Sequence, residues 1–164
     1  MSKSAAITAP QLWVVLARSH RALSTLAERS IADSGLCLSD FAVLEALLHK
    51  GPLTISEIQA KVLLASGSMT AAVDRAEKKG LVIRKTTSED RRARLVELTP
   101  EGTRVAESAF NKHAQHLEAA MAILDDAEKR QIYAPLKKLG RAAAEAVERR
   151  RSETTSKTEK EIQK

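Results

Sequence analysis

Small polar side chains that can hydrogen-bond to the edges of nucleic-acid bases gather in one stretch, which we expect to be a helix ending at Gly80. Behind them, Met69, Val73 and Ala76 recur at intervals of four and three residues and give this helix an apolar back. A helix that enters the major groove of DNA needs such a small, polar leading end. The candidate contact residues are Ser66, Ser68, Thr70, Ala71 and Arg75.

A basic hairpin is expected directly after this helix. Lys and Arg outnumber Asp and Glu from the helix to the end of the hairpin, which favours contact with phosphates or a minor groove over a merely solvated loop. We expect Arg75, Lys85 and Arg94 to meet phosphates, which position a protein without reading sequence. Asp90 is expected to orient Arg92 or Arg94 by a charge-assisted hydrogen bond. The candidate hairpin contacts are Lys85, Asp90, Arg91, Arg92 and Arg94.

Two helices before this stretch are needed to position it. An expected helix over 39–50 precedes a short helix that begins with the capping box of Thr54 and Glu57. The short helix and the base-reading helix are separated by only a few residues, which is the helix-turn-helix arrangement. Strands over 82–86 and 93–98 then form the hairpin.

Long helices are expected on both sides of this lobe. The first begins with a capping box of Thr8 and Gln11, and its apolar stripe is so wide that a partner subunit is the economical cover for it. Pro135 is expected to kink the last helix. The predicted organisation is a flexible N-terminus (1–9), dimerisation helices (10–34 and 100–148), a DNA-binding lobe (39–99) and a disordered basic and polar tail (149–164).

The composition fits one helical domain with a polyanionic partner. The chain has 164 residues and a formal net charge of +6, and its aromatic residues are one Trp, one Tyr and two Phe, so the core must be aliphatic. Cys37 is the only cysteine, which excludes an intrachain disulfide. No signal peptide and no membrane-spanning apolar run is present, so we expect a cytoplasmic protein without a membrane partner. No cofactor motif is found, and none is expected.

With this order of elements, the sequence resembles the MarR family of winged helix-turn-helix transcriptional regulators. Within the family it is most similar to the repressors that respond to methylhydroquinone and catechol, and this finer similarity is carried by Ser39-Asp40-Phe41, Leu44, His49-Lys50-Gly51-Pro52-Leu53, Leu64, Ser66-Gly67-Ser68, Phe110 with His113, and Lys137-Lys138-Leu139-Gly140. The resemblance covers about residues 10–148 and is carried by Gly51-Pro52-Leu53-Thr54-Ile55-Ser56-Glu57-Ile58, by Val73-Asp74-Arg75-Ala76-Glu77-Lys78-Lys79-Gly80-Leu81-Val82, and by Glu89-Asp90-Arg91-Arg92 leading to Leu98-Thr99-Pro100-Glu101-Gly102.

The resemblance implies a mainly α fold, with long N- and C-terminal dimerisation helices and a two-stranded β-wing. It also implies a homodimer that binds double-stranded DNA at a pseudo-palindromic operator. The recognition-helix positions of the family fall on the five contact residues named above. The wing arginine that reaches the minor groove in the family falls on Arg92.

A ligand pocket is a further implication of the resemblance, because related regulators bind phenols or aromatic acids between these helices. Phe41 and Glu45 lie four residues apart on one expected helix face, and His113 comes from the helix after the wing. Together with Trp13 and His20 of the first helix, they could hold a small phenol or quinone. Alternatively, Phe41 belongs to the core while Glu45 and His113 form an ordinary interhelical pair. The sequence leaves both interpretations open.

Cys37 and the histidines are the candidates for redox and metal chemistry. Cys37 lies before the second helix and is either a redox sensor or a small, partly buried thiol. Sensor cysteines in the family are usually flanked by tyrosines, whereas Tyr133 is the only tyrosine here. No acidic or cysteine ligand falls at a matching interval from the histidines, so we expect no metal site; they are His20, His49, His113 and His116.

Three function classes follow from these patterns. The first is a sequence-specific transcriptional regulator, a repressor released by a small phenolic or quinone-like ligand. The alternatives are a redox-responsive regulator acting through Cys37 and a non-specific architectural DNA-binding protein. An enzyme is not expected, since there is no Gly-rich phosphate loop, nucleophile elbow or paired acidic motif.

Overall fold

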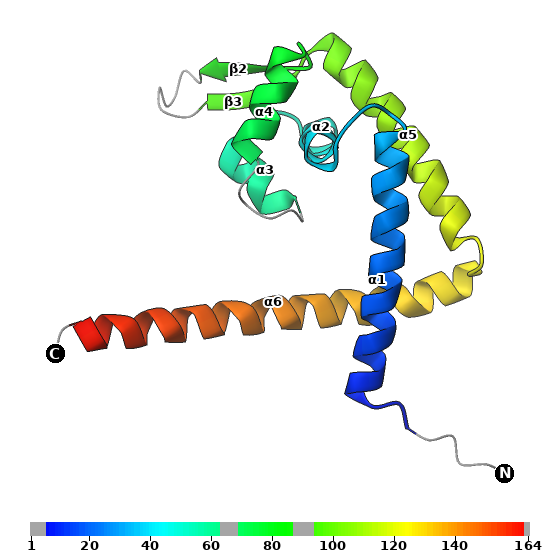
Figure 1. Cartoon of the computed structure of the whole chain (residues 1–164), viewed down its shortest axis with the longest axis vertical. Coiled ribbons are helices and arrows are strands. Elements are labelled where there is room, and N and C mark those ends of the chain that lie inside the picture. The colour runs from blue at the N-terminus through cyan, green and yellow to red at the C-terminus, as the bar shows by residue number, and fades with distance from the viewer. Residues whose placement is uncertain (1–5, 63–68, 87–93, 163–164) are drawn as a thin grey trace. The chain divides into compact units, whose positions relative to one another are not determined.

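The computed structural model describes residues 6–62, 69–86 and 94–162, and this part of the chain is mainly helical, as predicted (Figure 1). The chain divides after Ala120 into two compact units, of which the second contains helix α6. The elements in chain order are α1 (Ala9–Ala32), α2 (Leu38–Lys50), β1 (Leu53–Thr54), α3 (Ile55–Lys61), α4 (Met69–Lys78), β2 (Val82–Thr86), β3 (Arg94–Leu98), α5 (Pro100–Met121) and α6 (Asp126–Ile162).

The helices α1 and α3 begin at the predicted capping boxes. At α3, the hydroxyl of Thr54 accepts a hydrogen bond from the Glu57 N–H at 3.2 Å, and the Glu57 carboxylate accepts one from the Thr54 N–H at 2.8 Å. Thr8 and Gln11 form the same box at α1. Since the first N–H groups of a helix lack intrahelical partners, these side chains determine where each helix begins.

Helix α4 ends at Gly80, as predicted. Gly80 adopts a φ of 69°, its N–H donates to the Glu77 carbonyl at 2.9 Å, and the Leu81 N–H donates to the Ala76 carbonyl at 2.9 Å. This pair of bonds is a Schellman motif, in which a glycine in the left-handed region closes the last turn. The chain therefore turns from α4 directly into β2.

The sheet has one more strand than the two-stranded wing predicted from the sequence. Its order is β1-β3-β2, with both pairings antiparallel, so β3 is central. Val96 of β3 is fully buried and lies between Leu53 of β1 and Arg84 of β2. The strand β1 is only two residues long, which is too short to produce the alternating pattern by which strands are recognised in a sequence.

The core of the first unit is largely aliphatic, as the composition predicts. Met69, Val73 and Ala76 form the predicted apolar back of α4, and each is at most 2% exposed. Phe41 is the one Phe, Tyr or Trp side chain among the buried residues of the described part of the chain. The remaining large buried side chains are Ile31, Leu36, Val43, Leu44, Leu47, Leu53, Ile58, Leu81, Val82 and Val96.

The end of α4 and the start of α5 are joined by a close backbone contact at Gly102. The Thr99 hydroxyl donates to the Gly80 carbonyl at 2.7 Å and accepts from the Gly102 N–H at 2.9 Å, while the Thr99 N–H donates to the Leu81 carbonyl at 3.0 Å. A Cβ at Gly102 would lie 1.8 Å from the Leu81 carbonyl oxygen. The glycine that ends the Leu-Thr-Pro-Glu-Gly motif is therefore required for packing, because only glycine allows α5 to approach the Leu81 backbone this closely.

The second unit is formed largely by α6, which is capped at its start: Asp125 accepts from the Glu128 N–H at 2.8 Å. Pro135 lies inside this helix, and the helical assignment continues across it. The predicted disordered tail from residue 149 is corrected, because α6 remains helical to Ile162. Eight of the 14 residues from 149 to 162 are Glu, Lys or Arg, which are strong helix formers, and an Arg151–Glu148 ion pair one turn apart adds support.

Both terminal helices expose large apolar side chains. On α1 these are Leu12, Trp13, Val14 and Val15, and on α6 they are Ile132, Tyr133, Leu136, Leu139 and Val147. Apolar surface gathered in this way marks an interaction site in a soluble protein. No helix in the described ranges combines the length and apolar character needed to cross a membrane.

We predict that Gly102→Ala lowers the stability of the fold by about 2–3 kcal/mol, because the new methyl group must displace the backbone at Leu81. Urea unfolding followed by circular dichroism, at fixed protein concentration, measures the change.

Gly140→Ala is the matched control. A Cβ at Gly140 meets nothing within 4 Å, so the same substitution within α6 should leave stability unchanged or raise it by roughly 0.5–1 kcal/mol. Equal unfolding midpoints for Gly102→Ala and the unmodified protein would contradict the assigned contact.

Candidate nucleic-acid interface and ligand pocket

Helix α4 presents a small, exposed leading end in front of its buried back. Thr70 and Ala71 are exposed, whereas Met69, Ala72 and Val73 beside them are buried. This division places two of the predicted contact residues on the solvent side of the helix. The other two leading-end candidates, Ser66 and Ser68, lie outside the described residues.

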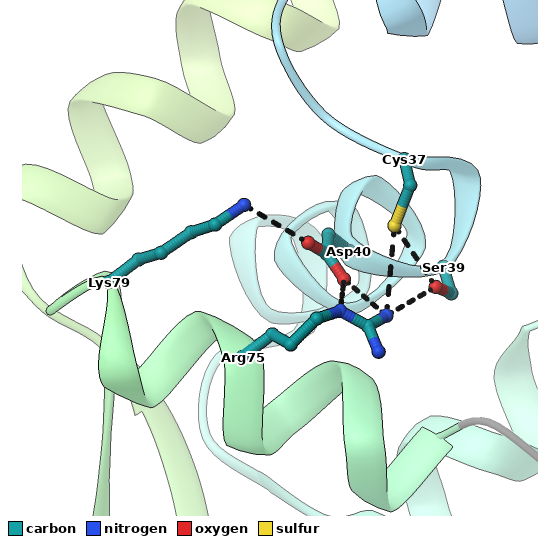
Figure 2. Close-up of polar contacts among 5 residues, drawn as sticks. All are labelled: Cys37, Ser39, Asp40, Arg75 and Lys79. Atoms are coloured by element: carbon teal, nitrogen blue, oxygen red, sulfur yellow. Dashed lines mark hydrogen bonds and ion pairs between the residues drawn. The ribbon is translucent and has the colours of Figure 1, made fainter.

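Arg75 is one of the predicted phosphate contacts, and the structure places its guanidinium against the start of α2. Nε and Nη2 of Arg75 donate to Asp40 Oδ1 at 3.0 and 2.6 Å, and Nη2 also donates to Ser39 Oγ at 2.8 Å (Figure 2). Lys79, one turn further along the chain, donates to Asp40 Oδ2 at 3.3 Å. We call Cys37, Ser39, Asp40, Arg75 and Lys79 the Asp40 cluster.

Asp40 is the buried member of this cluster, with only 4% of its side chain exposed. Burial raises the pKa of the Asp40 carboxyl, but the hydrogen bonds it accepts, above all from Arg75, outweigh burial and hold the pKa below its ordinary value. The carboxylate is therefore charged at neutral pH and fixes α4 against α2. Sequence analysis did not assign this role, because the partners are separated by 35 residues in the chain.

The opposite flank of α4 is fixed to the wing by Arg84 of β2. Its guanidinium donates to Asp74 Oδ1 at 2.5 Å and also to the Glu77 carboxylate. The hydrogen bond to Asp74 is the main cause of the raised pKa of Arg84. Both acidic side chains of α4 are thereby ion-paired, and their charge partly compensated, by a residue that the sequence analysis counted only as part of the basic charge. An uncompensated carboxylate on this helix would repel a polyanion.

The wing supplies two further candidates in the described part of the chain. Lys85 of β2, a predicted phosphate contact, is ion-paired with Glu97 of β3. Arg94 is exposed at the first residue of β3. Asp90, Arg91 and Arg92 lie outside the described residues.

A cavity of about 350 Å³ lies between α1, α2, α3 and α5 and contains three of the five predicted ligand residues: Phe41, Glu45 and His113. Its floor is apolar, with Ala27, Ile31, Leu38, Ala42, Ala46 and Val62, and its polar groups include three that the sequence analysis missed: His49, Lys50 and Lys61. The ring of His49 also meets that of Phe110 edge-on, with 4.6 Å between the ring centres.

His113 is oriented by a buried hydrogen bond rather than by a pair with Glu45. Its Nδ1 lies 2.7 Å from Ser30 Oγ, and the Ser30 hydroxyl donates its single proton to the Ala27 carbonyl at 2.8 Å. Ser30 must then accept from His113, which places the ring proton on Nδ1 and leaves Nε2 as an acceptor. The Phe41 ring meets the imidazole edge-on at 5.2 Å.

Trp13 and His20 do not belong to this cavity, contrary to our expectation. Trp13 is 69% exposed near the start of α1, and His20 is exposed and within 3.4 Å of Ser24 on its own helix. The cavity is lined by the last turns of α1, which place Ala27 and Ile31 there. Sequence position alone did not reveal which end of this long helix packs against α2.

Cys37 is the N-cap residue of α2, and its side chain is exposed. Its sulfur lies 3.3 Å from Ser39 Oγ and 3.7 Å from Arg75 Nη2. The thiol therefore belongs to the Asp40 cluster, not to the cavity. In the part of the chain that the structure describes, no group of three His, Cys, Asp or Glu side chains could hold a metal ion.

Comparisons with known proteins agree with this architecture. The sequence model of the MarR family matches residues 36–93. MhqR, an HTH-type transcriptional regulator of Bacillus subtilis, is 36% identical over 130 residues, which span 79% of this chain and 90% of that protein.

Two solved structures have the same fold. Bordetella bronchiseptica BpsR, whose DNA binding is regulated by 6-hydroxynicotinic acid, is 24% identical with a TM-score of 0.71, covering 82% of this chain and 96% of BpsR. A mutant of Escherichia coli MarR in complex with operator DNA is 22% identical with a TM-score of 0.68, covering 78% of this chain and 92% of MarR. From its identity to MhqR over nearly the whole of that protein, the chain belongs to the MarR family of helix-turn-helix transcriptional regulators.

Proposed function

We propose that this protein is a homodimeric repressor that binds a pseudo-palindromic operator and is released from it by a small hydroxylated aromatic ligand. The observation that carries the proposal is the placement of α4, with a buried apolar back, a small exposed leading end and both acidic side chains ion-paired with Arg84. This is the form that a helix must have to enter a major groove.

In this proposal α4 lies in the major groove and the wing follows the adjacent backbone. Thr70 can hydrogen-bond to a base edge, and the methyl group of Ala71 can contact a thymine methyl. Ser66 and Ser68 extend the same leading end along the sequence. Arg92 is proposed for the minor groove, and the exposed Arg94 for a phosphate.

The proposed dimer would cover the apolar side chains that α1 and α6 expose. Trp13 of α1 and Tyr133 of α6 are 69% and 66% exposed, and burying side chains of this size is the usual source of dimer stability. A two-fold dimer would carry two copies of α4, which requires an operator with two related half-sites.

The proposed ligand site is the cavity beside His113. Its volume is at the low end of ligand pockets and suits a single aromatic ring. A phenolic hydroxyl could donate to His113 Nε2 while the ring packs beside Phe41, and Lys50 or Lys61 could compensate a phenolate or carboxylate. The regulation of BpsR by a hydroxylated aromatic acid supports this class of ligand.

Release from the operator would follow if the ligand prefers a dimer whose two α4 helices no longer match successive major grooves. The loss of operator affinity is then set by the difference in ligand affinity between the two dimer states. Helix α2 connects the two sites, because Phe41 lines the cavity while the neighbouring Asp40 holds α4.

A second candidate is redox control through Cys37. The exposed thiol lies 3.7 Å from Arg75 Nη2, so its oxidation would disturb a side chain of α4.

Arg92→Ala should weaken operator binding by about 1–3 kcal/mol, because it removes a proposed minor-groove contact. Gel-shift titration at fixed salt measures the affinity, using the duplex found by footprinting the DNA upstream of the protein's own gene. Size-exclusion chromatography should show the same dimer for both proteins. Unchanged operator affinity would remove Arg92 from the interface.

Calorimetric titration with simple phenols, catechols and hydroxylated aromatic acids should show binding, and His113→Ala should weaken it about tenfold by removing a buried hydrogen-bond acceptor. His116→Ala is the matched control, because His116 lies one turn further along α5 and does not line this cavity. Equal losses in both variants would refute the proposed site.

Peroxide should release the unmodified protein from its operator if Cys37 is a sensor, and Cys37→Ser should then remain bound under the same treatment. Operator release by peroxide in both proteins, or in neither, would eliminate the redox candidate. Gel shifts before and after reduction with dithiothreitol provide the measurement.

A further inference from the structure

Two of the three nitrogens of the Arg75 guanidinium are already occupied in the protein alone. Nε donates to Asp40, and Nη2 uses its two protons on Asp40 and Ser39. Figure 2 shows the remaining nitrogen, Nη1, directed away from the carboxylate. Among the described residues no acceptor binds Nη1, and 42% of the Arg75 side chain is exposed.

This arrangement connects a buried carboxylate to an exposed cation on α4. Without Arg75, the buried carboxylate of Asp40 would keep only the 3.3 Å contact from Lys79 among its cationic partners, so the guanidinium is held firmly at one edge. An arginine fixed in this way has already lost much of its side-chain entropy before it meets a ligand. Two cations, Arg75 and Lys79, share the one carboxylate, so the Asp40 cluster retains excess positive charge.

The same geometry restricts what Arg75 can recognise. Reading a guanine requires two adjacent nitrogens of the guanidinium fork, each with a free proton. In Arg75 only Nη1 keeps its protons for an outside acceptor. A single free nitrogen suits one oxygen of a backbone phosphate, which can be bound without a fork.

We propose that Asp40 is a positioning residue for operator binding: with Ser39, it orients Arg75 so that Nη1 binds a backbone phosphate of the DNA next to α4. This inference rests on the proposed function and assigns a role to a buried acid in binding a polyanion. Arg75 is the contact residue, and Asp40 acts through it without touching the DNA.

Because Asp40 is negatively charged, the direction in which its neutralisation changes DNA affinity tests the proposal. Removing an acidic charge from a DNA-binding lobe strengthens binding to any duplex by electrostatics alone. If Asp40 positions Arg75, neutralising Asp40 instead weakens the affinity for the operator, because the Arg75 side chain must then lose its conformational freedom during binding. A residue that only supports the fold would change unfolding without producing this reversal.

The experiment measures fluorescence anisotropy of the footprinted operator duplex and of a random duplex, over a range of salt concentrations, with the full chain. Asp40→Asn should weaken operator binding roughly tenfold to a hundredfold, the range for hydrogen bonds to charged groups, and should weaken random-duplex binding as well, because a phosphate contact reads no sequence. Glu101→Gln is the matched control: it neutralises an exposed acid paired with Arg104 and should not weaken operator binding.

Two substitutions of Arg75 separate charge from geometry. Arg75→Lys keeps the charge but cannot contact Asp40 and a phosphate from separate, fixed nitrogens, so it should lose as much affinity as Asp40→Asn. Arg75→Ala should reduce the slope of log affinity against log salt by about 0.9 per subunit. In the Arg75→Ala protein, Asp40→Asn should not weaken operator binding any further.

The proposal is overturned if Asp40→Asn binds the operator as tightly as the unmodified protein, or if its effect persists without Arg75. Circular dichroism tests whether the variant is folded. If Asp40→Asn is not folded, Ser39→Ala tests the proposal in its place. This substitution removes one hydrogen bond made by Arg75 Nη2 and should lower operator affinity a few-fold. Failure of the unmodified protein to prefer operator over random duplex would instead refute the proposed function.

Discussion

The position of α4 depends on the buried carboxylate of Asp40. A charge that is only 4% exposed costs several kcal/mol to desolvate unless it is paired, and its partners Arg75 and Lys79 both come from α4 or the residue after it. Apolar contacts between α2 and α4 bury area but tolerate small rotations of a helix. The hydrogen bonds from Arg75 Nε and Nη2 restrict such a rotation, because both bonds converge on Oδ1 of Asp40.

Arg84 adds the corresponding constraint from the wing. It binds Asp74 and Glu77, so α4 is held by ion pairs on two flanks and by buried side chains behind. These contacts also change the charge that α4 presents, since its own acids are paired with Arg84 while Lys78 remains exposed. Rigidity and charge compensation are therefore supplied by the same side chains, as is appropriate for a helix that must enter a groove of fixed width.

Local signals in the sequence were sufficient for most of the fold. The box of Thr54 and Glu57 and the cap at Gly80 act within a few residues, so their effects could be predicted without tertiary information. The strand β1 was missed because two residues have no periodicity. The cluster around Asp40 was missed because its bonds cross 35 residues, and the sequence contains no signal for which cation a buried acid will select. Phe41, Glu45 and His113, which were expected to lie together, do line one cavity, whereas Trp13 lies near the end of α1 that is remote from it.

Adjacent residues of α2 serve the two sites. Asp40 holds α4, while Phe41 lines the cavity and packs against the His113 ring at 5.2 Å. A ligand that displaces the Phe41 ring must either rotate α2 or move α5, because Phe41 is buried between them and the packed interior cannot absorb the change. Rotation of α2 would move Asp40 and with it Arg75, while movement of α5 would act on the end of α4 through Thr99, which bonds to Gly80 and Gly102. Either displacement reaches α4, which gives a physical basis for coupling between a small cavity and a DNA-reading helix.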